Sequence, residues 1–227
     1  MPRPTFMWPL APATLMLVPL LARAGEDVPP SVANDFPGWA VAEFASGDLN
    51  GDGRSDTALT LKRHDRDEGQ AALAVYLAGD KGQRLQFRAL KAVCIGCAGP
   101  KGSPDMVVGT PAIAKGVLNV NYFGGSREVW NYLYKWRFDA KSGRFALIGA
   151  TLTHTDTSPA NGNGPVTTWY VDANFLSGKM QVRESGSKPL LCPIPPGFGR
   201  GSLADFDFDK ALAEPPKVDK RACVPAR

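Results

Sequence analysis

The chain has 227 residues, 44% of them hydrophobic and 21% charged, with a formal net charge of +4. This length and composition predict one domain with a sizeable core, or one domain with an extended tail. Lys and Arg residues are scattered singly rather than gathered in runs, so the sequence argues against nucleic-acid binding.

Residues 1–24 are predicted to be a cleaved signal peptide. Arg3 supplies a positive start, an apolar run covers residues 6–21, and residues 22–24 form a small-x-small cleavage site. Prolines interrupt the apolar run, and no later stretch approaches the roughly 18 apolar residues that a membrane span requires. We therefore expect a periplasmic or secreted protein with no transmembrane segment after cleavage. An uncleaved anchor is the alternative.

The exported part is expected to divide into two regions. A β domain covers residues 25–184 and holds a candidate calcium loop at residues 48–56, and a proline-rich tail covers residues 185–227. Helix is scarce in both regions. The best candidates are residues 32–36 and residues 204–212, and the second is rich in aspartate, which is a poor helix interior.

Residues 47–59 read GDLNGDGRSDTAL and are the most informative stretch. Five oxygen donors match positions one, three, five, seven and nine of a calcium loop: Asp48, Asn50, Asp52, the backbone carbonyl of Arg54, and Asp56. Gly53 at position six permits the sharp turn. Position twelve is Leu59 rather than the Glu of an EF-hand, and a strand pattern follows. We expect calcium as a stabilising ion. The alternative is a surface turn that binds no ion.

The body of the chain has the alternation of β-strands. Apolar residues alternate with polar ones in four segments, at residues 59–61, 71–77, 118–122 and 167–175. Short turns separate the segments and favour antiparallel pairing, because a parallel crossover needs a dozen or more residues. We predict an all-β fold with minor helix, an antiparallel meander of about eight strands that forms a sandwich or an open barrel.

Four cysteines in an exported chain predict two disulfides. Three pairings are possible. We favour Cys94–Cys97 together with Cys192–Cys223, the second bridge clipping the tail to the body. A thioredoxin-like redox site at the CxxC is an alternative, weakened because a Gly- and Pro-rich loop follows where that motif opens a helix. A four-cysteine zinc site is weakened by the wide second spacing.

The strongest predicted strand covers residues 129–138, where aromatic side chains recur at period two. They are Trp130, Tyr132, Tyr134, Trp136 and Phe138. An apolar partner strand is expected at residues 145–152. We predict that the rings form the core of the sheet. The alternative is an exposed platform on which sugars stack.

The sequence contains no complete catalytic constellation. His64 and His154 lie among polar residues, and there is no GxSxG elbow and no HExxH. A metal or acid–base site around His154 and Asp156 is the alternative. A concave site that gathers these residues with Arg127 would favour it.

The segment GDLNGDGRSD followed by a strand resembles the calcium loop of FG-GAP/VCBS-type repeats, which use DxNxDGxxD. Only one copy is present, so no multi-blade propeller is implied. Further motifs, from FPGW at 36–39 through CIGCAG at 94–99 and YFGGSR at 122–127 to NFLSGK at 174–179, resemble a group of uncharacterised bacterial exported proteins. The resemblance covers roughly residues 36–182. It implies a bacterial envelope protein with one calcium loop and implies no activity.

Three classes of function stay open. A calcium-stabilised binding or interaction module that meets an envelope protein or a glycan is favoured. An exported hydrolase or hydrolase inhibitor, with a site near His154 and Asp156, is the second class. A purely structural envelope component is the third.

Overall fold

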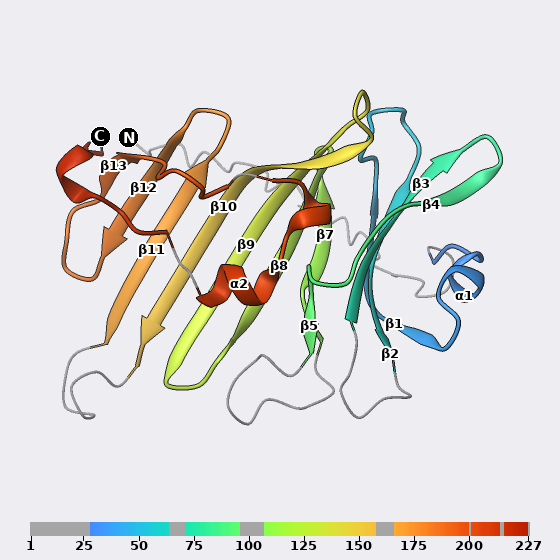
Figure 1. The fold of residues 1–227 in the computed structure, drawn as a ribbon, viewed down its shortest axis with the longest axis horizontal. Coiled ribbons are helices and arrows are strands. Elements are labelled where there is room, and N and C mark those ends of the chain that lie inside the picture. Colours follow the sequence, from blue (N-terminus) through green and yellow to red (C-terminus); the bar gives the residue numbers. More distant parts are fainter. Residues whose placement is uncertain are drawn as a thin grey trace, which may run out of the picture.

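The computed structural model describes residues 28–63, 71–95, 107–157, 166–199, 201–213 and 216–226. Two antiparallel sheets with little helix make up these residues, which confirms the predicted all-β class (Figure 1). No helix in the described ranges is long and apolar enough to cross a membrane. The predicted signal peptide, His64 and Cys97 lie outside the described residues.

The first sheet is a meander of four strands in chain order. Its strands are β1 (Trp39–Gly47), β2 (Asp56–Arg63), β3 (Ala71–Gly79) and β4 (Gly82–Ala89). The first six residues of β2 and of β3 are all buried, because both faces of this sheet are covered. The predicted N-terminal helix is present as α1 (Val32–Asp35) and packs Val32 and Phe36 on one face. The other face belongs to the main core.

The second sheet is a meander of eight strands, also in chain order. Its strands are β7 (Thr110–Ala114), β8 (Val117–Gly125), β9 (Glu128–Asp139), β10 (Arg144–Asp156), β11 (Thr167–Asn174), β12 (Lys179–Glu184), β13 (Leu190–Pro193) and β14 (Val224–Pro225). A two-stranded ribbon of β5 (Cys94–Ile95) and β6 (Val107–Val108) precedes it in the chain.

The two faces of the eight-stranded sheet differ in chemistry. On one face of β9, Trp130, Tyr132, Tyr134 and Trp136 are each at most 6% exposed, which confirms the predicted aromatic core for four of the five rings. The fifth, Phe138, is partly buried and packs against this core. β10 pairs with β9 as expected, so that Leu152 lies opposite Tyr132 and adds to the same face. The aromatic face of the eight-stranded sheet is therefore buried.

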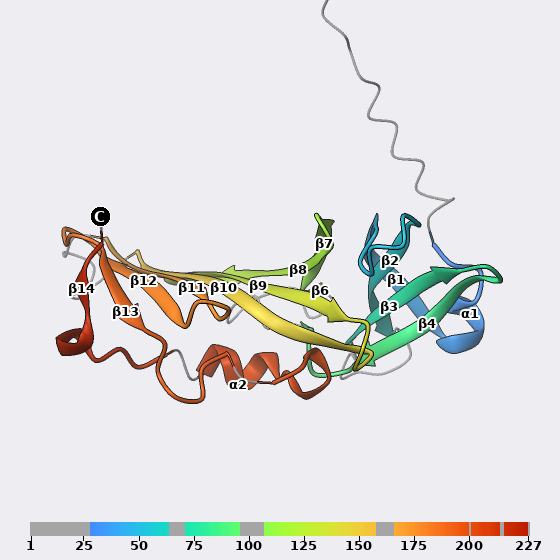
Figure 2. The same ribbon diagram turned by 90° about the horizontal axis from the view of Figure 1, so that it is seen from above.

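The cover of the aromatic face comes from the C-terminal part of the chain. We call the described residues 195–199, 201–213 and 216–217 the strap. It contains η2 (Leu203–Asp205) and α2 (Phe208–Ala213), and Figures 1 and 2 show α2 lying against one side of the eight-stranded sheet. The single helix expected over residues 204–212 divides into these two pieces, because Phe206 between them has an extended backbone.

The region predicted as a C-terminal tail also contributes strands to the eight-stranded sheet. β13 pairs with β12, and β14 pairs with β13. The predicted Cys192–Cys223 disulfide is present and links the strand before the strap to the residue before β14. The segment that the sequence presents as a tail thus supplies two strands, a cover and a covalent link.

Candidate functional site

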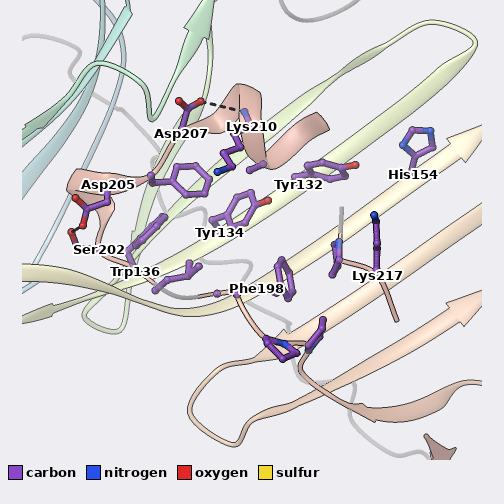
Figure 3. A pocket seen from close by; sticks show the side chains of 18 of the residues that line it. Tyr132, Tyr134, Trp136, His154, Phe198, Ser202, Asp205, Asp207, Lys210 and Lys217 are labelled. Carbon is purple, nitrogen blue, oxygen red and sulfur yellow. Dashed lines mark hydrogen bonds between the residues drawn. The ribbon is translucent and has the colours of Figure 1, made fainter. Parts of the chain in front are cut away.

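A groove of about 1110 Å³ lies between the aromatic face of the eight-stranded sheet and the strap (Figure 3). Tyr132, Tyr134 and Trp136 of β9 form part of its floor. His154 of β10 and Trp169 of β11 continue the floor across the neighbouring strands. The strap forms the opposite wall. The groove exists because an irregular segment covers this face where a second sheet would have packed more evenly.

The tyrosines under the strap are neutral at physiological pH. Burial raises the pKa of Tyr132 above its ordinary value of 10.0, and burial, followed by the neighbouring Tyr132, raises the pKa of Tyr134. Tyr122 is fully buried, its hydroxyl donates to the carbonyl of Ala92, and burial raises its pKa as well. These side chains are buried with protonated hydroxyls, and none of them serves as a base.

Two phenylalanines anchor the strap in the aromatic face. The Phe206 ring lies 4.8 Å from that of Tyr134 and 5.1 Å from that of Trp136, centroid to centroid. The Phe208 ring stacks on Tyr122 at 4.0 Å with an interplanar angle of 8°. Aromatic pairs of this kind contribute about 0.5–1.5 kcal/mol beyond the burial of their area. The strap is therefore a packed wall of the groove.

The rim of the groove carries charges of both signs. Asp205, Lys210 and Lys217 are exposed there. Asp207 is half-buried, and one of its carboxylate oxygens lies 3.4 Å from Lys91 Nζ. The lining of the groove thus holds two aspartates and two lysines, and neither sign dominates.

A smaller cavity of about 340 Å³ adjoins the groove. His154 and Trp169 line both cavities, so the two spaces share a wall. Asp156 and Glu184 supply the acidic side chains of the smaller one. The structure therefore brings His154 and Asp156 to one concave site, which meets part of the criterion for the second class of function.

The groups around that site are already engaged. Arg127 approaches Asp156 with Nε and Nη2, each 3.3 Å from a carboxylate oxygen, and this hydrogen bonding raises the pKa of Arg127. His154 Nε2 lies 3.8 Å from an oxygen of Glu128. The Ser185 hydroxyl, which also lines the cavity, accepts the backbone N–H of Thr168. Arg127 itself lines neither cavity. The arrangement holds a carboxylate as an ion pair and does not free it for proton transfer.

The candidate calcium loop joins β1 to β2 and is closed by its own side chains. Asp48 accepts backbone N–H bonds from Gly51 at 2.6 Å and Gly53 at 2.8 Å, and the bond from Gly53 is the largest cause of the lowered pKa of Asp48. Both glycines have positive φ, +78° and +81°, which a side chain would resist. Asn50 and Asp52 each accept the N–H two residues further on. The loop is a succession of Asx turns.

Asp56 fastens this loop to the sheet. It is fully buried and accepts the N–H of Leu49 and the N–H of Ala78, each at 2.8 Å. Burial raises its pKa, while these two bonds lower it. Because the bond to Ala78 reaches β3, Asp56 ties the loop to the neighbouring strand whether or not an ion is bound.

The donors of the loop suit calcium in kind. Each of the four side chains presents oxygen, the ligand atom that calcium prefers, and the glycine at position six has the required backbone. Within the ranges that the structure describes, no three His, Cys, Asp or Glu side chains are gathered as a metal-binding cluster. Calcium stays a prediction. No loop residue lines the groove or the smaller cavity, so an ion there would act on stability.

The cysteine predictions have separate outcomes. Cys192 and Cys223 are joined, so the four-cysteine zinc site is wrong. Cys94 begins β5, whereas Cys97 is outside the described residues. The Cys94–Cys97 bridge and its redox alternative stay predictions.

The comparisons with known proteins provide no relative for this chain. No family model, no curated protein and no solved structure matches it. The resemblance to FG-GAP/VCBS loops therefore rests on the residues of the loop, and a function has to be argued from this chain's own side chains.

The sequence patterns do not predict some of the residues that form the groove and its wall. Phe198 and Phe206 line the groove, and Phe208 is a buried anchor of the strap. All three stand in a proline- and glycine-rich segment whose composition is typical of a tail. Three phenylalanines within eleven residues indicate that this segment packs on the body, because phenylalanine side chains favour burial over exposure to water. Trp169 was assigned to a strand without a role of its own.

Proposed function

We propose that this chain is an exported binding module of the bacterial envelope whose ligand occupies the groove under the strap. The observation that carries the proposal is the floor of the groove, where Trp169 and His154 remain partly exposed beside a buried aromatic core. A mostly apolar concavity with a few convergent polar groups is the usual form of a ligand site. The predicted signal peptide and the Cys192–Cys223 disulfide support export.

Calcium enters this proposal as a structural ion. Asp48, Asn50, Asp52, Asp56 and the Arg54 carbonyl would hold it at the end of the four-stranded sheet, where it would neutralise the carboxylates of the loop. Ligand binding would then depend on calcium only through the stability of the fold.

A hydrolase is the second candidate, because His154 and Asp156 line one cavity with Glu184. Two carboxylates near a histidine are compatible with acid–base chemistry. Binding is favoured over hydrolysis because Arg127 already pairs with Asp156 and Lys220 Nζ lies 2.8 Å from Glu184.

The test is co-sedimentation of the purified protein with the insoluble envelope fraction of a bacterium. Ala211→Trp would place a large side chain in the groove, since Ala211 lines it. The matched control is Ala204→Trp, an exposed strap position that does not line the groove. We expect Ala211→Trp to lose retention and Ala204→Trp to keep it, with melting curves checked for both.

Equal retention of the two variants would overturn the proposal. If Ala211→Trp fails to fold, Trp169→Ala replaces it. Soluble fragments released from the envelope fraction are measured in the same experiment, and release that disappears in His154→Ala would favour the hydrolase instead.

A further inference from the structure

Trp169 differs from the other tryptophans of the eight-stranded sheet. Trp130 is 6% and Trp136 is 1% exposed, and both rings pack against phenylalanines of the strap. Trp169 is only partly buried, lines both cavities and makes no ring contact with any described aromatic residue. An indole surface is thus available where the two cavities meet.

Polar side chains flank this indole in register. His154 lies directly opposite Trp169 on β10, and Glu184 lies directly opposite it on β12. Directly opposed residues share a face of the sheet, and adjacent strands are about 4.8 Å apart. The row therefore presents an aromatic surface with a hydrogen-bonding group on each side. A ligand that fits the row has an apolar face and polar edges.

The charges of the two cavities are balanced. The groove is lined by two aspartates, Asp205 and Asp207, and by two lysines, Lys210 and Lys217. In the smaller cavity, Asp156 pairs with Arg127 and Glu184 pairs with Lys220. Because charges of the two signs are equal in number around each cavity, a strongly charged ligand of either sign would gain little from such a site. The site favours a neutral ligand.

The position of the groove argues against an extended peptide. A peptide that adds a strand needs the free N–H and C=O groups of a sheet edge. The floor of the groove consists of interior strands, whose backbone groups pair on both sides. The floor therefore offers side chains and no free sheet edge to a ligand.

We propose that a neutral glycan binds where the groove meets the smaller cavity, with one sugar ring stacked on Trp169 and its hydroxyls hydrogen-bonded to His154 and Glu184. A pyranose has the form that the row requires, since its C–H groups form an apolar face and its hydroxyls lie on the edges. This inference rests on the proposed function, because it names the ligand of the same groove.

The experiment measures binding by isothermal titration with three neutral tetrasaccharides, built from N-acetylglucosamine, β-linked glucose and α-linked glucose. We expect at least one to bind, and Trp169→Ala to weaken its binding roughly tenfold, the loss of one stacking contact. Trp169→Phe should lose less, because it keeps a ring. His154→Ala should weaken binding by about two- to tenfold, as expected for one hydrogen bond.

The control is Trp39→Ala. Trp39 is also a partly buried tryptophan, but it lies on β1 of the other sheet and lines neither cavity. Glycan affinity should not change in this variant. A lower affinity in Trp39→Ala equal to that in Trp169→Ala would show that stability rather than stacking is being measured, and would overturn the inference.

Two further outcomes would overturn it. One is that none of the three glycans binds. The other is that a proline-rich peptide binds in their place, since such peptides also dock on aromatic grooves. If glycans fail while envelope retention still depends on Ala211 and Trp169, the proposed binding module stands and only its ligand class is wrong. If retention is independent of the groove, the proposed function itself fails.

Discussion

The two sheets of this protein are covered in different ways. In the four-stranded sheet, α1 covers one face and the main core covers the other, and β2 and β3 are buried over six consecutive residues. In the eight-stranded sheet, burial alternates along β8 and β9, because only one face is covered. The second face is polar, as in the Lys135, Thr151 and Asp172 contacts across three strands.

This difference in cover suggests different roles for the two sheets, one as a scaffold and the other as the floor of a site. The central strands β2 and β3 are buried on both faces and leave no surface there for a ligand. A sheet whose cover is a strap with two phenylalanine anchors keeps a groove beside those anchors. The four-stranded sheet with its loop is expected to govern stability, and the covered face of the eight-stranded sheet to govern binding.

The largest expected effect comes from the aromatic floor. Trp136→Ala should lower the free energy of unfolding by roughly 3–5 kcal/mol, through lost burial and a cavity. Trp136→Phe should cost less, because the indole N–H of Trp136 is buried without a hydrogen-bond partner among the described residues. Urea unfolding followed by circular dichroism measures both. A Trp136→Ala protein as stable as wild type would show that the rings are not core.

Removal of the disulfide should destabilise the eight-stranded sheet more than the four-stranded sheet. Cys192 and Cys223 are 31 residues apart in the chain, and loss of a bridge of this span should cost roughly 3–4 kcal/mol in the chain-entropy model. In the double serine variant, amides of β12 and β13 should lose hydrogen-exchange protection while those of β2 and β3 keep it. Uniform loss of protection would mean that the two sheets open as one unit.

Alanine substitutions at two glycines of the strap test how tightly the strap packs on the sheet. A Cβ added at Gly199 would lie 1.9 Å from a ring carbon of Phe175, whereas one added at Gly197 meets nothing within 4 Å. Both glycines have positive φ, so each alanine carries a backbone cost of about 1 kcal/mol.

The clash should add about 1–3 kcal/mol in Gly199→Ala only. Thermal melting of the two variants gives the difference directly. Equal losses would show that the strap moves aside without cost and is a loose cover, contrary to its aromatic anchors.

The smallest effect is expected from calcium, at the end of the four-stranded sheet. At ten times the dissociation constant, a bound ion contributes roughly 1.4 kcal/mol. Melting with calcium and with EDTA should differ by this amount in the wild type, and Asp52→Ala should abolish the difference.

Asp139→Ala is the matched control for calcium. Like Asp52, Asp139 is exposed, and hydrogen bonds within its own turn, chiefly from Ser142, lower its pKa. It lies far from the loop in sequence, so its variant should keep the calcium response. If the wild-type melting curves with calcium and with EDTA coincide, the calcium prediction is wrong and the loop is a succession of Asx turns that binds no ion.

Much of the local structure could be predicted from residue patterns. The alternation at 129–138 predicted β9 and its buried rings, and the even number of cysteines led to the Cys192–Cys223 bridge. These predictions depend on periodicity and on nearby residues, which a single sequence displays. The division of residues 204–212 into η2 and α2 was not predictable, because it depends on where Phe206 inserts into the sheet.

By itself, the sequence determined the fold class, the candidate calcium loop and the face on which the β9 rings lie, because each depends on spacing along one segment. Only the tertiary structure decided what covers those rings, and with it where a groove remains. Trp169 and His154 belong to neighbouring strands, while the wall opposite them comes from residues near the C-terminus. Such a site is made by contacts between distant segments, and the chain shows no local pattern for it.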